Sequence, residues 1–409
     1  MTALAPRDEQ EIIDVITAAV ANGTPIDITG GGSRLGLGHA TSAATRLSTS
    51  GLRGVTLYEP SELVLSAKAG TSLKEITDLL DQNGQELAFE PMDHGVLYGG
   101  DTNAGTIGGA ISVNASGPRR IKVGAARDHL LGFRAANGRA EVFQSGGRVM
   151  KNVTGYDMCK LMSGAFGTLG VLSEITVKVM PKAETQQTLI IHGLDDVTAI
   201  SVMTHASGLP HEVSSLAHMP VLARDFALPL SNGSSITALR VEGPEISVRQ
   251  RLDGLKSNLA HLLDKSSTSV ETLDQAATVA LWACLRDVSM FAVQPYQIWR
   301  ISTAPTEGPA IARGAEAGGI PIAGYFYDWA GGLIWMAVEP AADAHATALR
   351  SLVDAVGGHA TLVRAADDVR AAVPVFHPQP GPLAGLSERI RKGFDPELVL
   401  NRGRMRGDL

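Results

Sequence analysis

The sequence predicts an α+β fold made of two domains that differ in their chemistry. Helix and strand patterns alternate through residues 1–182, where two segments are unusually rich in glycine. All four tryptophans fall instead within residues 183–376, among strands separated by helical stretches. That pattern is typical of an antiparallel sheet with helices on one face. We therefore expect a compact second α+β domain, with residues 377–409 forming a C-terminal return that packs on the first.

The first domain is expected to contain two subdomains that divide near residues 55–60. Its opening helix, "RDEQEIIDVITAAVANG", has apolar residues at helical spacing from Ile12 to Val20 and ends at Asn22-Gly23. The short strand "PIDIT" follows and leads directly into "GGGS". A strand that opens into three glycines is the first candidate for a binding loop.

The second subdomain is predicted to begin with two strands, "GVTLYEP" and "ELVLSAKAG". A helix follows, with Ser72 as its N-cap, Glu75 completing a capping box and Gly84 at its end. The strands "LLGFRAANG" and "AEVFQSGG" are expected to form a hairpin that turns at Asn137-Gly138. A short helix in "NVTGYDMCKLMSG" and the strand "VLSEITVKVMP" complete this subdomain, which Pro181 closes.

In the second domain, helical patterns cover residues 195–207, 245–264 and 341–356. Strands are predicted at "QTLIIHG", "SITALRVEG", "YQIWRIS" and "GLIWMAVEP". The segment "DWAGGLIW" is expected to be a hairpin that turns at Gly331-Gly332. A proline-rich link, "HPQPGP", then leads to the closing element.

The composition excludes several classes of protein. The net charge of the chain is −7 and its basic residues are scattered, which argues against nucleic-acid binding. No apolar run reaches the roughly 18–20 residues of a transmembrane helix, and the acidic N-terminus does not resemble a signal peptide. The two cysteines, Cys159 and Cys284, cannot supply the roughly four thiolates of an iron–sulfur cluster. A reduced, cytosolic setting is the simplest expectation.

The first glycine loop matches neither familiar phosphate-binding pattern. Leu37 stands where a Walker A motif needs lysine, and Leu35 stands where the Rossmann fingerprint needs its third glycine. Glycines do let backbone N–H groups approach phosphate oxygens closely. This observation alone leaves a phosphate cradle and a simple tight turn both open.

A second glycine-rich segment, "TIGGAISVNASG", offers another set of backbone donors, with Ser112, Asn114 and Ser116 as side-chain partners. One long dinucleotide held between two separated segments would explain both of them. The alternative is that each segment is an independent surface loop.

Taken together, the motifs resemble FAD-linked oxidases of the vanillyl-alcohol oxidase (PCMH-type) superfamily. The motifs are "GGGS", "TIGGAISVNASGPRRIKVGAARDHLLGF", "KNVTGYDMCKLMSGAFGTLGVL" and the C-terminal "LNRGRM". Within that superfamily, the sequence is most similar to the smaller FAD-binding subunits of bacterial glycolate oxidase complexes. The resemblance implies a PCMH-type FAD-binding domain of two α+β subdomains, followed by a cap domain.

The resemblance also implies which residues bind FAD. The "GGGS" loop would hold the pyrophosphate, and the second glycine segment would run from the phosphates towards the flavin ring. The "GTLGVLSEI" positions would flank adenine and ribose, and the C-terminal return would reach the flavin. The residues implied are Gly30, Gly31, Gly32, Ser33, Pro91, Gly100, Thr106, Gly108, Gly109, Ser112, Asn114, Gly117, Gly170, Val171, Ile175, Asn401 and Arg404.

Two departures from the family pattern carry predictions. Many relatives bond flavin covalently through a histidine at the first loop, where this chain has Ser33-Arg34 and, further on, His39. We therefore predict non-covalent FAD. The cap region is also short and lacks an evident metal-binding histidine pair. His205, His211 and His218 have unsuitable spacing, so no metal site is predicted.

The catalytic residues are not identified by the sequence. Arg300 in "IWRIS" is one candidate, because an arginine can form a bidentate pair with a substrate carboxylate; an internal salt bridge is the alternative. Tyr156 is another candidate, although Tyr156-Asp157 also suits ordinary helix capping. Arg119 and Arg120 would either balance phosphate charge or face a partner subunit.

The resemblance implies an FAD subunit of a multi-subunit glycolate (2-hydroxyacid) oxidase or dehydrogenase. Its partners would be a larger homologous FAD subunit and an iron–sulfur subunit that accepts electrons. It would be cytoplasmic, with no direct membrane insertion, and would reach a membrane only through partners. Two alternatives stay open: a self-sufficient FAD-linked oxidase, and a non-catalytic assembly subunit with structural or absent FAD.

Overall fold

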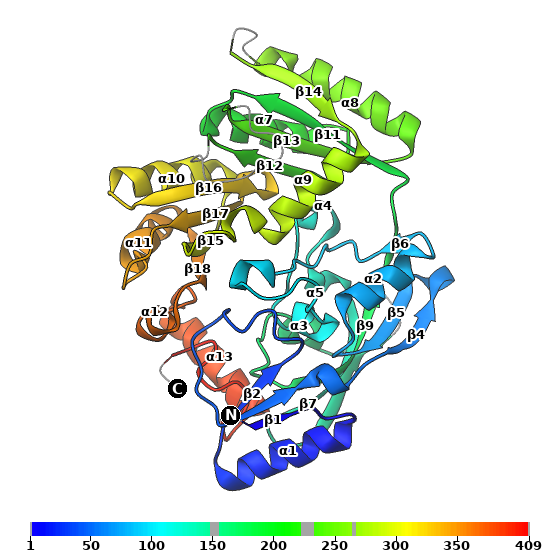
Figure 1. Cartoon of the computed structure of the whole chain (residues 1–409), viewed down its shortest axis with the longest axis vertical. Coiled ribbons are helices and arrows are strands. Elements are labelled where there is room, and N and C mark those ends of the chain that lie inside the picture. The colour runs from blue at the N-terminus through cyan, green and yellow to red at the C-terminus, as the bar shows by residue number, and fades with distance from the viewer. Residues whose placement is uncertain (1, 148–154, 222–232, 264–266, 408–409) are drawn as a thin grey trace. The chain divides into compact units, whose positions relative to one another are not determined.

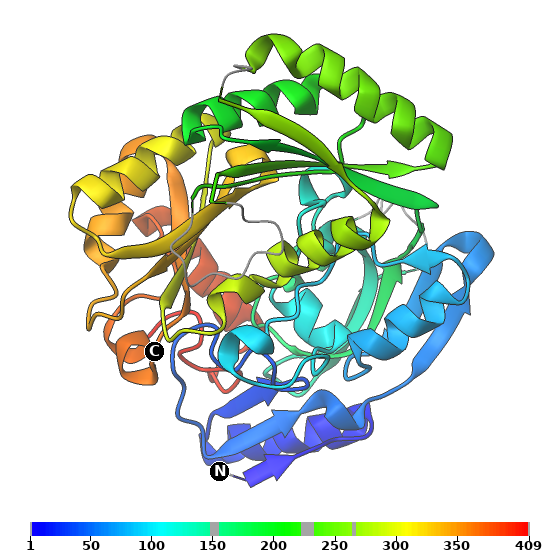
Figure 2. The same cartoon turned by 45° about the horizontal axis from the view of Figure 1, so that its top comes forward.

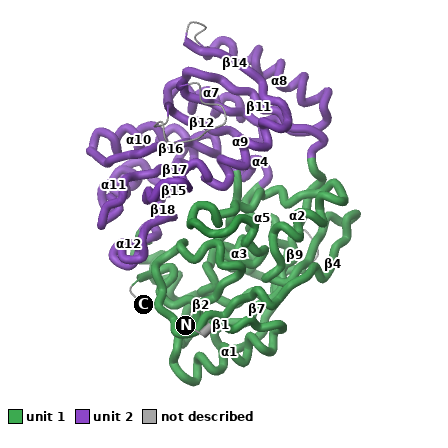
Figure 3. Tube along the Cα trace, in the orientation of Figure 1, with its two compact units in different colours: residues 1–117, 124–182, 378–409 green, residues 118–123, 183–377 purple. Residues whose placement is uncertain are grey.

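The computed structural model describes residues 2–147, 155–221, 233–263 and 267–407. The chain divides into two compact units, which Figure 3 shows in different colours. Unit 1 comprises Met1–Gly117, Gly124–Lys182 and Pro378–Leu409, and unit 2 comprises Pro118–Val123 and Ala183–His377. Most of the predicted "KNVTGYD" motif lies outside the described residues.

Unit 1 begins with a small parallel sheet (Figure 1). Its strand order is β1 (Thr2–Leu4), β3 (Thr45–Ser48) and β2 (Ile26–Thr29). The helix α1 (Glu9–Asn22) buries Ile12 and Ile16 and ends at Gly23 in the left-handed conformation. The C-terminal return adds a parallel bridge between Leu400 and Ile26, so the end of the chain extends this sheet beside β2.

The second sheet of unit 1 has five antiparallel strands. Their order is β4 (Val55–Glu59), β5 (Val64–Lys68), β9 (Val171–Lys178), β7 (Leu130–Ala136) and β8 (Val142–Gly146). The strand pair β6 (Gln85–Glu86) and β10 (Met180–Pro181) lies apart from both sheets. The helices of unit 1 after α1 are α2 (Leu73–Asp81), α3 (Ile107–Ser112), α5 (Ala126–His129), α6 (Met158–Met162) and α13 (Gly381–Phe394).

Local signals in unit 1 predicted α1, α2, β2 and the hairpin of β7 and β8, but not β1, β3 or α3. Ser72 accepts a hydrogen bond from Glu75 N at the start of α2, and β7 pairs with β8 as the predicted hairpin. The helix α3 forms inside the glycine-rich segment, which was expected to be largely loop. Thr106 caps this helix by accepting a hydrogen bond from Gly109 N, and Ile107 and Ile111 anchor it in the core. Its glycines conceal the helical pattern.

Unit 2 is built on an eight-stranded antiparallel sheet. The strand order is β14 (Ser269–Leu273), β11 (Thr185–His192), β13 (Ile236–Gly243), β12 (Ser215–Met219), β16 (Ile322–Asp328), β17 (Leu333–Val338), β15 (Gln297–Thr303) and β18 (Gly358–Arg364). One face packs on the helices α7 (Asp196–Gly208), α8 (Glu245–Leu259), α10 (Gly308–Ala317) and α11 (Ala346–Val356) in a single hydrophobic core. The short helices α4 (Arg120–Val123) and α12 (Asp367–Ala372) complete the unit.

The predicted α+β class and the antiparallel second sheet are confirmed. The expectation that helices cover one face of that sheet is incomplete, because α9 (Gln275–Asp287) lies on the opposite face from α8 (Figure 2). Trp282 of α9 donates a hydrogen bond to Thr188 Oγ1, whose neighbour Leu189 belongs to the core on the other face. Neither α9 nor α10 was among the predicted helices. Within the described residues, no helix is long and apolar enough to span a membrane.

Candidate functional site

A cavity in unit 1 brings together segments from the whole length of that unit. Its volume is about 760 Å³, including space open to solvent. The lining residues come from the first glycine loop, the start of α3, the turn before β9 and the C-terminal return. They are Ile28, Thr29, Gly30, Gly31, Gly32, Ser33, Arg34, Leu35, Leu37, Thr49, Ala69, Thr106, Gly108, Gly109, Ser112, Val113, Phe166, Gly167, Gly170, Leu172, Asn401 and Arg404.

Close backbone packing explains why the first loop needs glycine. A Cβ atom on Gly31 would lie only 1.7 Å from the carbonyl oxygen of Ala104, so any side chain there would push the two segments apart. Gly32 has φ +83°, a left-handed conformation that glycine adopts without strain. The triple glycine thus allows the first loop to lie directly against the segment before α3, and this contact forms one wall of the cavity.

Asn401 joins three segments that are far apart in the sequence. Its Oδ1 accepts a hydrogen bond from Ile28 N at 2.6 Å, and its Nδ2 donates to the Phe166 carbonyl at 2.7 Å. The side chain is 3% exposed, and its backbone has φ +42°. Because both the oxygen and the nitrogen of its side-chain amide are hydrogen-bonded, Asn401 joins the end of β2 to the turn before β9.

Arg404 stabilises the first loop through hydrogen bonds to its backbone. Its Nη1 donates to the carbonyl oxygens of Leu35 and Leu37, at 3.0 and 3.2 Å. Its own carbonyl accepts a hydrogen bond from His39 N. Arg404 therefore binds the protein backbone, while the buried His39 ring lies against Gly407 and does not line the cavity.

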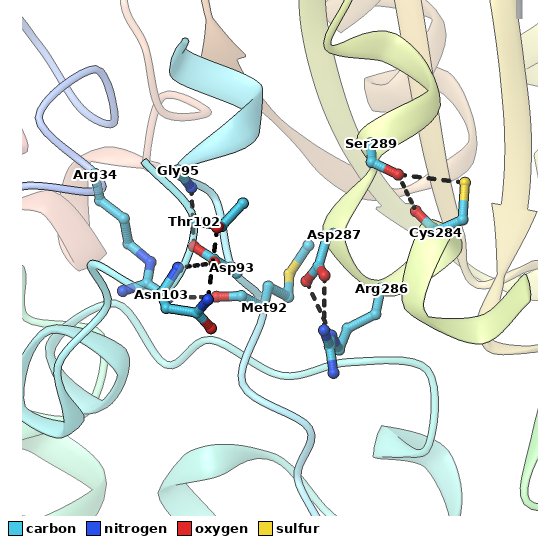
Figure 4. A network of polar contacts seen from close by, with 10 residues as sticks. All are labelled: Arg34, Met92, Asp93, Gly95, Thr102, Asn103, Cys284, Arg286, Asp287 and Ser289. Carbon is cyan, nitrogen blue, oxygen red and sulfur yellow. Dashed lines mark hydrogen bonds and ion pairs between the residues drawn. The ribbon is translucent and has the colours of Figure 1, made fainter. Parts of the chain in front are cut away.

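Arg34 connects the first loop to a second loop, residues 92–105 (Figure 4). Its Nε donates to His94 Nδ1 at 3.0 Å, and its Nη2 donates to the Met92 carbonyl. Asp93 closes the second loop by accepting hydrogen bonds from Gly95 N and Asn103 N. The side chain of Arg34 is half-buried and lines the cavity.

Eleven of the seventeen residues expected to bind FAD line this cavity: Gly30, Gly31, Gly32, Ser33, Thr106, Gly108, Gly109, Ser112, Gly170, Asn401 and Arg404. The other six, Pro91, Gly100, Asn114, Gly117, Val171 and Ile175, do not. Val171 and Ile175 are fully buried in hydrophobic cores. Asn114 accepts a hydrogen bond from Arg127 N, and Gly117 N donates to the Phe89 carbonyl.

Several lining residues were not among the expected ones. Arg34, Thr49, Phe166 and Gly167 all reach the cavity. Gly167 is the first residue of "GTLGVLSEI", of which only Gly170, Val171 and Ile175 were expected to contact FAD, so its glycine was a usable signal. Nothing local marked Arg34 or Thr49, because their roles depend on segments distant in the sequence.

The two catalytic candidates have very different surroundings. Arg300 lies on β15 in unit 2, half-buried, with its Cζ 5.0 Å from the ring centroid of Trp329 and 6.0 Å from that of Trp335. Arg120 lies over the same Trp329 ring, at 4.3 Å. Burial, together with repulsion from Arg120, lowers the pKa of Arg300 to about 10, so it remains a cation at neutral pH. Tyr156 is 90% exposed, beside the Asp157 that caps α6.

The histidines and cysteines do not assemble a metal centre in the described part of the chain. His205 packs against His261, His211 bonds to Asn258, and His218 bonds to Thr237. Burial raises the pKa of the Cys159 thiol to about 11, so it stays protonated. Burial also raises the pKa of Cys284, although Ser289 Oγ lies 3.3 Å from its sulfur (Figure 4).

Arg119 has a partner within unit 2. Its Nη1 lies 3.5 Å from Glu242 Oε1, in a largely buried ion pair. Arg119 and Arg120 both belong to Pro118–Val123, the segment of the glycine-rich region that clusters with unit 2.

Comparison with known proteins defines the class of this molecule. Residues 2–146 match the FAD binding domain family, and this range includes the first glycine loop and α3. The fold is shared with 4-ethylphenol oxidase from Gulosibacter chungangensis, at a TM-score of 0.70 and 14% identity over 98% of this chain and 88% of that one. An alkyldihydroxyacetonephosphate synthase has a similar fold, at a TM-score of 0.69 and 13% identity, covering 98% of this chain and 76% of that one. The protein is an FAD-linked oxidoreductase with the PCMH-type fold.

The family can be stated more closely. Glycolate oxidase subunit GlcE of Escherichia coli is 30% identical over 98% of both chains, and glycolate oxidase subunit GlcD of Bacillus subtilis is 27% identical over 62% of this chain and 54% of its own. The chain belongs to the GlcE family of glycolate oxidase subunits. A D-lactate dehydrogenase of Anaerostipes hadrus is 30% identical over a shorter region, 44% of this chain and 37% of its own.

Proposed function

We propose that this chain is the smaller FAD-binding subunit of a multi-subunit enzyme that oxidises glycolate, or a closely related 2-hydroxyacid, to the 2-oxoacid. The observation that carries the proposal is end-to-end similarity to GlcE combined with a cavity in unit 1 that eleven of the expected FAD-binding residues line. Bound FAD would supply the hydride acceptor for such an oxidation. The protein would position that cofactor and pass its electrons to a partner.

The residues of unit 1 suit an extended dinucleotide. The residues Gly30–Gly32, Thr29 and Thr106 all line the cavity, where their backbone N–H groups and hydroxyls would bind the pyrophosphate. Phe166, Leu172 and Val113 supply apolar surface for the flat rings. The eleven lining residues from the family pattern are proposed as contacts of FAD, and the six others as residues that support its site.

We also propose that the FAD is not covalently bound. The first loop carries Ser33 and Arg34, neither of which forms the flavin bond seen in relatives, and His39 lies away from the cavity. Acid precipitation of the purified protein should therefore release all the flavin into the supernatant. Yellow colour retained in the pellet would contradict this.

Arg300 is proposed to bind the substrate carboxylate. It is a charged, half-buried guanidinium held over aromatic rings, and Arg120 adds a second positive charge beside it. Arg300→Gln should raise KM for glycolate roughly 10- to 100-fold in the assembled enzyme, because a charge-assisted hydrogen bond is lost. The matched control is Arg313→Gln, which removes an exposed arginine from α10. An unchanged KM would identify Arg300 as a structural cation.

The electron acceptor is proposed to be an iron–sulfur subunit, and the assembly is proposed to include a larger homologous flavoprotein. This chain has two cysteines, one of which is held as a buried thiol, whereas a cluster needs about four thiolates. Purified alone, the chain should show a flavin spectrum with little glycolate turnover. Full turnover should appear only when both partners and an artificial electron acceptor are added.

The same reconstitution separates the alternatives. Robust turnover by the isolated chain would favour a self-sufficient oxidase. Failure of the apo-protein to bind any flavin would favour an assembly subunit.

A further inference from the structure

We propose that Arg34 is the cationic group that binds the pyrophosphate of FAD, and that His94 and the Met92 carbonyl hold its guanidinium ready for this role. The proposal rests on FAD binding by unit 1, as proposed above, and does not depend on the identity of the substrate. Phosphate oxygens carry the formal charge of FAD, so a fixed cation beside them is a strong determinant of affinity.

Two of the groups that hold the guanidinium of Arg34 are neutral hydrogen-bond acceptors. Nε donates to His94 Nδ1 at 3.0 Å, and Nη2 donates to the Met92 carbonyl. His94 is 5% exposed, so its ring is itself held by the surrounding structure. These two neutral acceptors orient the side chain and add no negative charge of their own beside it.

The first of these bonds also defines the state of His94. Arginine Nε can only donate a hydrogen bond, so His94 Nδ1 must accept it and the ring proton must lie on Nε2. Protonation of Nδ1 would break the bond and place a second positive charge beside the guanidinium. A neutral His94 is therefore part of the arrangement that positions Arg34.

Nη1 of Arg34 lies beside a part of the wall that contains glycine. A Cβ atom on Gly109 would lie 3.5 Å from Nη1, and one on Gly105 would lie 3.9 Å from it. Both distances are those of an ordinary van der Waals contact, so the guanidinium lies beside these two glycines. The same arginine lines the cavity and follows Ser33 directly, so one loop presents both backbone N–H groups and a cation.

Arg404 is the other arginine among the lining residues, and its contacts point to a different role. Its Nη1 donates to two carbonyl oxygens of residues 35 and 37, which holds the loop in shape. Arg34, by contrast, crosses from one loop to the other at the wall that contains Thr106 and Gly109. This difference assigns phosphate binding to Arg34 and loop support to Arg404.

The test is the dissociation constant of FAD for the apo-protein, measured by flavin fluorescence over a range of salt concentrations. Arg34→Gln should weaken FAD binding roughly 10- to 100-fold and flatten its salt dependence, because a charge-assisted contact is lost. Arg34→Lys should keep the salt dependence while losing affinity, since lysine keeps the charge but not the forked geometry. Arg139→Gln, which removes an exposed arginine of unit 1 outside the cavity lining, should behave as wild type.

A second variant distinguishes charge from positioning. His94→Leu removes the acceptor but leaves the arginine, so FAD affinity should fall while the salt dependence is retained. ADP, which carries the pyrophosphate without the flavin, should lose affinity for Arg34→Gln by the same factor as FAD. Thermal unfolding of each apo-protein reports whether the variant is folded. If Arg34→Gln does not fold, the FAD affinity and salt dependence of Arg34→Lys decide whether Arg34 binds the pyrophosphate.

An unchanged salt dependence in Arg34→Gln would overturn the proposal and leave Arg34 as a link between loops. So would an Arg34→Lys variant whose FAD binding had lost its salt dependence. Failure of the wild-type chain to bind FAD would instead defeat the proposed function. Normal FAD binding without glycolate oxidation by the complex would defeat the proposed substrate alone.

Discussion

The cavity of unit 1 and the core of unit 2 are held together in different ways. Around the cavity, single polar side chains tie together loops that are 60 to 373 residues apart in the sequence, as Arg34 and Asn401 do. In unit 2, one continuous hydrophobic core lies between a regular sheet and four helices. A binding site made of loops therefore depends on a few specific hydrogen bonds, whereas the sheet depends on many interchangeable apolar contacts.

Two spectroscopic probes separate these regions. All four tryptophans, Trp282, Trp299, Trp329 and Trp335, belong to unit 2, so intrinsic tryptophan fluorescence reports that unit. Flavin fluorescence reports the cavity of unit 1, because free and bound flavin differ in emission. Variants that change one signal and not the other test whether the two regions behave independently.

The largest effect is expected in the unit 2 core. Leu239→Ala on β13 removes a fully buried side chain and should reduce the free energy of unfolding by about 2–5 kcal/mol. Urea unfolding followed by tryptophan fluorescence measures it, and FAD affinity should not change while the protein is folded. Val197→Ala, at an exposed position of α7, is the control and should change stability by less than about 0.5 kcal/mol. Weakened FAD binding in Leu239→Ala would show that the regions are coupled.

The next largest effect is expected at Asn401. Asn401→Ala leaves Ile28 N and the Phe166 carbonyl without their partner, which should cost about 2–4 kcal/mol for two buried groups. Heating should release flavin at a lower temperature while the tryptophan transition is unchanged. Asn401→Asp keeps the acceptor and tolerates the positive φ, so it should recover part of the loss. Equal shifts in the temperature of flavin release and in the tryptophan transition would contradict the independence of the two regions.

Gly31→Ala should have a smaller effect confined to the cavity. The added methyl group would meet the Ala104 carbonyl, and overpacking of this kind costs about 1–3 kcal/mol. Titration of the apo-protein should show weaker FAD binding. Gly393→Ala is the matched control in unit 1, because nothing lies within 4 Å of its new methyl group and it sits inside α13. It should stabilise the protein by about 0.5–1 kcal/mol.

The smallest effect is a pH dependence in unit 2. Burial alone would raise the pKa of Asp196, but His218, whose Nε2 lies 3.4 Å from Asp196 Oδ1, and hydrogen bonds from Tyr327 and Tyr325 outweigh it and lower that pKa. The stabilisation by Asp196 is therefore fully present above the unfolded pKa of about 3.9 and is lost as the pH falls through the folded value. Asp196→Asn should cost about 1 kcal/mol near neutral pH.

Urea unfolding followed by tryptophan fluorescence provides the measurement for Asp196. The difference in stability between wild type and Asp196→Asn should shrink as the pH is lowered from 6 towards 3. A difference that is constant over this range would show that the charge of Asp196 does not contribute.

Much of the fold followed from short-range patterns. Capping at Ser72, the turn between β7 and β8, and the helices α1, α7 and α8 all depend on residues within a few positions of one another. The helix α3 was missed because its glycines weaken the local signal, although the Thr106 cap and the burial of Ile107 and Ile111 stabilise it. Likewise, no local pattern predicted α9 or the face of the sheet that it covers.

The candidate site, like the fold, was predicted only in part by local patterns. Glycine content marked the loops at residues 30–33 and 106–109, since glycine is needed wherever backbone must approach closely. Composition does not reveal what each glycine approaches. Gly31 meets the Ala104 carbonyl, and Gly108 would meet the Ala69 carbonyl, so both serve packing between segments of the protein itself.

The sequence by itself determined the class of fold, the order of most elements, the segments rich in glycine and the family. These properties are carried by neighbouring residues and by motifs whose spacing can be read along the chain. Only the tertiary structure decided that Arg34 meets His94, that Asn401 joins β2 to the turn before β9, and that Val171 and Ile175 pack in cores. The physical reason is that a hydrogen bond acts over about 3 Å in space, whatever the separation along the chain.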